Sequence, residues 1–159
     1  MKKKKFTKIR ENITEVEYQK LLTYLNGKED LTTNTKNNLK RTFILLYFTG
    51  MRINEVKQLK VKDINTIFEK EELIIVTHKT RKERKLFFSK EAIKQIKKHF
   101  VFNDNSKDED FIITTKGNTS KTPNSSTFIA KVNSFIQEVL GHRYSSHSFR
   151  AGIITDMSK

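Results

Sequence analysis

Three short stretches of the sequence carry side chains that suit phosphate chemistry. In the first, TGMRINE (residues 49–55), Arg52 stands where a helix is expected to begin. Its planar guanidinium and the free backbone N–H groups of a helix start can together hold an anion. Glu55 follows three residues later on the same expected face and could orient the arginine or a neighbouring histidine. A helix-capping turn with a surface ion pair is the alternative interpretation.

The second stretch is the basic HKTRKER, residues 78–84. A basic turn of this kind suits contact with a groove or a phosphate, and a lysine placed beside a leaving oxygen can act as a general acid. A solvated, charged turn is the alternative, and His78 is more simply interpreted as a turn residue than as a ligand.

The third stretch, HSFR, places His147 and Arg150 three residues apart, near the end of the sequence. On a helix, residues at this spacing share a face. Both side chains could then reach one phosphate, the arginine by bidentate donation and the histidine as a donor or as an acid or base. The alternative is a partly buried histidine near a helix start and an unrelated arginine.

Together these residue types suit phosphoryl transfer. That reaction needs charge neutralisation around the non-bridging oxygens and a proton for the leaving oxygen. Two arginines, a histidine and a lysine would supply both without a metal ion. The sequence has no cluster of Asp and Glu at metal-ligand spacing and no Gly-x-x-x-x-Gly-Lys phosphate loop. We therefore expect no metal and no other cofactor.

Hydrophobic patterning predicts the elements that would position these stretches. We expect an α+β fold, mostly helical, with a small three-stranded antiparallel sheet. The helices are expected within residues 14–25, 33–50, 53–59, 90–100 and 125–140, and a last one near residue 146. The strands are expected near residues 63–68, 73–77 and 84–88, so that the basic turn joins the last two.

Composition limits the class of protein. The chain has 159 residues, which suits one domain, here residues 13–159 after a basic leader or linker over residues 1–12. Its net charge of +14 points to a polyanion, with nucleic acid first and an anionic membrane surface second, unless the lysines are surface filler. It has no Cys, no apolar run of about 18 residues and no secretory signal. We expect a cytoplasmic protein.

The three stretches, in this order, resemble the catalytic domain of tyrosine recombinases, the phage integrase family. TGMRINE matches the family's first arginine and acidic partner, at Arg52 and Glu55. HKTRKER is similar to its hairpin lysine motif, with Lys79 at the catalytic position, and HSFR matches its His-x-x-Arg. The run EVEYQKLL looks like the opening helix, so the resemblance covers about residues 13–159.

This resemblance implies a site-specific recombinase that cleaves and rejoins DNA through a phosphotyrosine, without a cofactor. Arg52 and Arg150 would hold the phosphate oxygens, and Lys79 would protonate the leaving 5′-oxygen. His147 would assist the nucleophile or hold the phosphate, with Glu55 in support. The partner would be double-stranded DNA, bound by a homo-oligomer, a tetramer in the intact protein. From the basic hairpin turn we expect further DNA contacts by Arg81, Lys82 and Arg84.

The sequence also departs from the family pattern. The family's second His or Trp and its tyrosine nucleophile follow the His-x-x-Arg motif, whereas this sequence ends at Lys159. We therefore expect a catalytic domain cut before the nucleophile and limited to DNA binding, with the four tyrosines, Tyr18, Tyr24, Tyr47 and Tyr144, as packing residues. The alternatives are a degenerate relative that only binds or regulates DNA, and a basic RNA- or membrane-associated protein.

Overall fold

The structure is a computed structural model that describes residues 12–76, 81–102, 105–116 and 118–149. The expected leader lies outside these ranges except for its last residue, and so do the predicted site residues Lys79 and Arg150. The helices are α1 (Glu15–Gly27), α2 (Thr33–Thr49), α3 (Ile53–Lys57), α4 (Val61–Lys70), α5 (Lys90–His99) and α6 (Ser125–Leu140). The strands are β1 (Glu72–Val76) and β2 (Glu83–Phe87). A further helical turn opens at residues 147–149.

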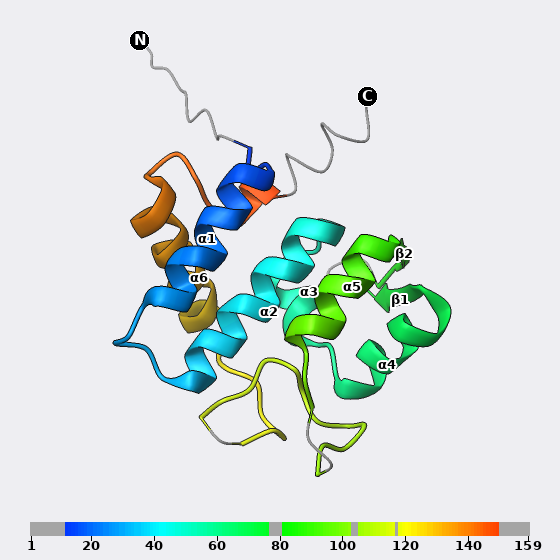
Figure 1. The fold of residues 1–159 in the computed structure, drawn as a ribbon. Coiled ribbons are helices and arrows are strands. Elements are labelled where there is room, and N and C mark those ends of the chain that lie inside the picture. Colours follow the sequence, from blue (N-terminus) through cyan, green and yellow to red (C-terminus); the bar gives the residue numbers. More distant parts are fainter. Residues whose placement is uncertain (1–11, 77–80, 103–104, 117, 150–159) are drawn as a thin grey trace.

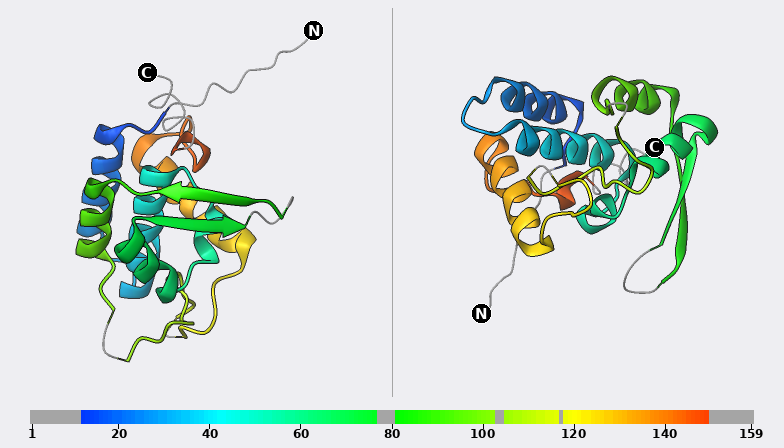
Figure 2. Two further views of the ribbon diagram at one scale, coloured as in Figure 1. Left: turned by 90° about the vertical axis from the view of Figure 1, so that its right-hand side faces the viewer. Right: turned by 90° about the horizontal axis from the view of Figure 1, so that it is seen from below.

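Helix α2 is the centre of the fold. It packs against α1, α3 and α5, while α6 packs against α1. Helices α5 and α6 lie on opposite sides of α2 (Figures 1 and 2). The buried side chains of all these elements form one hydrophobic core that extends from Ile13 to Phe149. Within the described residues, no helix has both the length and the apolar composition needed to cross a membrane.

The turn between α2 and α3 is made by Gly50. This residue has φ 70°, in the left-handed region that glycine adopts without steric cost, and its N–H donates to the Leu46 carbonyl at 3.0 Å. The next residue, Met51, is fully buried and anchors the chain in the core. As a result, the chain reverses sharply, and Arg52 becomes the residue that caps the start of α3.

The sheet of the described residues is a two-stranded hairpin that stands out from one side of the helical body (Figure 2). Strands β1 and β2 pair antiparallel, with Ile75 opposite Arg84 and Leu73 opposite Leu86. Because successive side chains point to opposite faces of a strand, these four share one face. The three apolar ones are buried, and Arg84 is the polar member of the inward face.

The prediction of a third strand over residues 63–68 was wrong, because this segment belongs to helix α4. Its buried residues, Val61, Ile64 and Ile67, recur every three residues, which is the spacing of one helical face. Asp63 supplies the start signal, since its carboxylate accepts from the Lys60 N–H at 2.9 Å. The β-branched residues of the segment favoured a strand in the prediction. The helical spacing of its buried residues outweighs that preference in the structure. The mostly helical α+β class is confirmed.

Candidate functional site

Arg52 and His147 line the same pocket, although they come from distant parts of the sequence. Its volume is about 180 Å³, and it lies between the start of α3, helix α6 and the turn before residue 147. Both side chains are exposed to solvent. The residues lining it are Met51, Arg52, Ile53, Asn54, Ile129, Asn133, Ser146 and His147. An arginine and a histidine over a small, open pocket make a site suited to an anion.

Arg52 is held through its backbone. Its N–H donates to Oε1 of Glu55 at 2.9 Å, and its carbonyl accepts from the Glu55 N–H at 2.9 Å and from the Val56 N–H at 3.0 Å. These three bonds fix the first turn of α3 around Arg52. The guanidinium therefore projects from a rigid backbone into solvent, where it is available to a ligand.

Glu55 is a buried carboxylate at the base of this arrangement. Its side chain is 5% exposed, and Oε1 also accepts from Nη2 of Arg84 on β2, at 3.0 Å. A buried charge needs such a partner, because its removal from water is costly. Its second oxygen, Oε2, has no hydrogen-bond partner among the residues that the structure describes.

His147 is positioned by contacts of its neighbours with the core. The Ser146 N–H donates to Oδ1 of Asn133 on α6 at 2.8 Å, and the His147 N–H donates to Oγ of Ser145 at 3.2 Å. The carbonyl of Ser148 accepts from the Ile13 N–H at 3.2 Å. The histidine is thus tied both to α6 and to the segment that leads into α1.

The remaining predicted site residues divide into two groups. Lys79 and Arg150 lie outside the described residues, so their place relative to the pocket remains a prediction. Arg81 and Lys82 are exposed just before β2, where contact with a polyanion is possible, and Arg84 pairs with Glu55. Their assignment as DNA contacts also stays a prediction.

Sequence reasoning missed the polar residues that α3 and α6 add to the pocket. Asn54, Asn133 and Ser146 line it beside the two predicted side chains. One signal was present: Asn133 is an amide within a largely apolar helical segment, FIAKVNSFI. Within the described ranges, no group of three or more His, Cys, Asp and Glu side chains gathers as metal ligands would.

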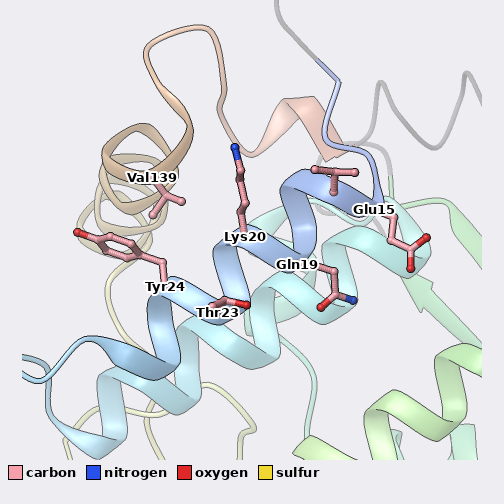
Figure 3. A pocket seen from close by; sticks show the side chains of 7 residues that line it. Glu15, Gln19, Lys20, Thr23, Tyr24 and Val139 are labelled. Carbon is pink, nitrogen blue, oxygen red and sulfur yellow. The ribbon is translucent and has the colours of Figure 1, made fainter.

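A larger hollow of about 730 Å³ lies along α1, beside the end of α6 (Figure 3). Val16, Tyr24 and Val139 give it an apolar lining, and the hydroxyl of Tyr24 donates to Glu138 at 2.7 Å. None of the predicted site residues lines it. The smaller pocket is therefore the candidate site, because two of the predicted site residues, Arg52 and His147, line it.

Comparison with known proteins defines the class. A model of the phage integrase family matches residues 11–159, so the chain belongs to this family. The fold is that of tyrosine recombinases. It is similar to the crystal structure of XerA recombinase, with a TM-score of 0.66 and 15% sequence identity over 99% of this chain.

Two structures of the XerH site-specific recombinase also match. The complex with a palindromic difH substrate after cleavage has a TM-score of 0.62 and 19% identity over 94% of this chain. The complex with difH before cleavage has the same TM-score and identity, over 97%. A search of curated proteins by sequence found no match. The chain spans about half of each solved recombinase: 53% of XerA, and 42% and 44% of the two XerH chains.

Proposed function

We propose that this chain is the phosphate-binding part of the catalytic domain of a site-specific DNA recombinase. The observation that carries this proposal is the shared pocket of Arg52 and His147 in a member of the phage integrase family. The net charge of +14 supports a polyanionic partner, for which we propose double-stranded DNA. The two similar XerH recombinase structures each hold a difH substrate.

In this proposal Arg52, Lys79, His147 and Arg150 act together in one strand-cleavage reaction. A tyrosine hydroxyl gives its proton to His147 or to water, and its oxygen attacks the phosphorus of a DNA diester, forming a 3′-phosphotyrosyl bond as the bond to the 5′-oxygen breaks. Arg52 and Arg150 hold the non-bridging oxygens, where negative charge increases during the attack. His147 holds the phosphate or assists the nucleophile, and Lys79 gives a proton to the leaving 5′-oxygen. Rejoining reverses these steps with a 5′-hydroxyl of the partner strand, on a tetramer of the intact protein.

The attacking tyrosine is, in our proposal, none of the four in this sequence. Tyr18 is buried and stacks on Tyr47 with ring centroids 4.0 Å apart, and burial raises the pKa of Tyr18. Tyr24 donates to Glu138, and Tyr144 packs partly buried against the core. The described lining of the pocket includes none of them. This chain would therefore bind DNA without forming the covalent intermediate.

Replacement of Arg52 tests the proposal. Arg52→Gln should weaken binding to a 20-base-pair duplex by about tenfold, because a charge-assisted contact to a phosphate is lost. The measurement is fluorescence anisotropy of a labelled duplex at fixed salt. A suicide duplex that traps covalent adducts should give none with the unmodified chain.

Lys94→Gln is the matched control, because it removes one exposed positive charge from α5, on the side of α2 opposite α6 (Figures 1 and 2). It should change the affinity much less than Arg52→Gln does. Equal losses for both variants would mean that only net charge matters, and would contradict the proposed phosphate site. An adduct on the suicide duplex would contradict the assignment of the tyrosines.

A further inference from the structure

A line of charged groups leads from the β-hairpin to the candidate site. Nη2 of Arg84, on β2, lies 3.0 Å from Oε1 of Glu55. The same oxygen accepts from the backbone N–H of Arg52 at 2.9 Å. Thus Glu55 joins Arg84, which is not among the residues lining the pocket, to Arg52, which lines it.

The pair of Arg84 and Glu55 differs from an ordinary surface ion pair. Surface pairs contribute little, because both charges are already well solvated. Here the Glu55 side chain is 5% exposed and the Arg84 side chain 35% exposed, so the glutamate depends on this partner. The alternation of β2 places Arg84 on the buried face of the hairpin, beside Leu86. Its side chain is therefore directed at the helical body.

This arrangement matters for Arg52 because Glu55 is also close to it. A buried carboxylate without a cationic partner attracts the nearest available cation. Arg52 is one such cation, because its backbone N–H already binds Glu55 at 2.9 Å. If that guanidinium turned toward Glu55, it would be lost to a phosphate in the pocket.

We infer that Arg84 is a positioning residue: by neutralising Glu55, it keeps the Arg52 guanidinium available for the phosphate. The inference rests on the proposed function, since it assigns a role in the same site. It gives Arg84 an effect on DNA binding that passes through Glu55 and requires no contact between Arg84 and DNA.

A double-mutant cycle separates this role from direct contact. Arg84→Met keeps the aliphatic stem and removes the charge, and Glu55→Leu removes the carboxylate that Arg84 neutralises. With Glu55 present, Arg84→Met should weaken binding to the labelled 20-base-pair duplex by about tenfold. In the Glu55→Leu background, the same change should alter the affinity by less than about twofold. An equal loss in both backgrounds would overturn the inference.

Lys85→Met is the matched control on the same strand. Lys85 points to the opposite face of the hairpin and pairs with Glu72 at 3.5 Å. Its loss should cost the same small amount of affinity with and without Glu55. If Arg84→Met alone fails to fold, the comparison of Glu55→Leu with Glu55→Leu/Arg84→Met can still overturn the inference through a loss of about tenfold, because neither variant contains the buried carboxylate.

A second measurement tests, in the absence of DNA, whether Arg84 positions Arg52. In a ¹H–¹⁵N NMR spectrum, Arg84→Met should shift the backbone and Nε–H signals of Arg52, and Lys85→Met should leave both in place. Unchanged Arg52 signals in a folded Arg84→Met variant would overturn the positioning role. Failure of the proposed function would have a different signature: those signals would shift with Arg84→Met, whereas Arg52→Gln would leave duplex affinity unchanged.

Discussion

Lys57 is a buried cation, and its ammonium group contacts a neutral hydroxyl, with no carboxylate paired to it among the described residues. It lies in the last turn of α3 and is 7% exposed, and its Nζ donates to Oγ of Ser125, in the first turn of α6, at 2.8 Å. A neutral hydroxyl does not offset the loss of water around an ammonium group. Burial accordingly lowers the pKa of Lys57. Lys57→Met should raise the free energy of unfolding at pH 7 by about 1 kcal/mol, measured by urea denaturation.

The sign of the pH dependence follows from the direction of this shift. With a pKa of Lys57 lower in the folded than in the unfolded chain, the unfolded chain binds more protons between the two values, so stability increases with pH there. The advantage of Lys57→Met should therefore shrink as pH rises from 7 toward about 10.4, the ordinary lysine value. Lys94→Met, at an exposed site on α5, should show no such trend. An advantage independent of pH would contradict this account.

Asn38 shows how one element is fixed to another, because its amide joins α2 to the segment around Thr114. Nδ2 donates to the Thr114 carbonyl at 2.9 Å, and Oδ1 accepts from the Thr114 N–H at 3.2 Å. Asn38 is 6% exposed, so its loss leaves a buried N–H without a partner. Asn38→Ala should lower the free energy of unfolding by about 2 kcal/mol in urea denaturation.

Asn34 provides the control for this contact. It binds the same carbonyl at 3.1 Å and the Thr114 hydroxyl at 2.9 Å, but it is less buried than Asn38. Asn34→Ala should cost clearly less, because it leaves the Thr114 N–H paired with Asn38. Equal costs for the two variants would show that the bond to the buried N–H is not what stabilises the segment.

Helix α4 and the hairpin show what could be predicted at the scale of an element. The hairpin strands were predicted within one residue of their observed limits, because a run of apolar, β-branched or aromatic residues lies on each side of the basic turn. The segment of α4 was wrongly predicted as a strand, because local β propensity was preferred over the spacing of Val61, Ile64 and Ile67. The β propensity of single residues is a weak guide to secondary structure where the burial of one helical face determines it.

At the scale of the whole molecule, the sequence motifs predicted which residues form the site, but not the contacts between elements that hold those residues in place. The order of the motifs was enough to select Arg52 and His147, which the fold brings to one pocket. The pairing of Arg84 with Glu55 was not predictable, because it depends on how the hairpin packs on the start of α3. Contacts between elements distant in sequence leave no local pattern, and such contacts hold this site in place.

The segment that carries His147 depends on the whole core through Phe149. This ring is 1% exposed and lies 6.1 Å from Phe43 of α2, which in turn lies 5.7 Å from Phe135 of α6. Phe149→Ala should lower the free energy of unfolding by about 3–5 kcal/mol, as expected for a large cavity in a core.

Because His147 is two residues away, Phe149→Ala should also weaken duplex binding at a temperature where the variant remains folded. The measurements are urea denaturation and anisotropy, with Phe87→Ala as the control. Phe87 is 72% exposed on the outer face of the hairpin, so its loss should change stability by less than about 0.5 kcal/mol. Full duplex affinity in a folded but destabilised Phe149→Ala variant would show that packing of this ring does not position His147.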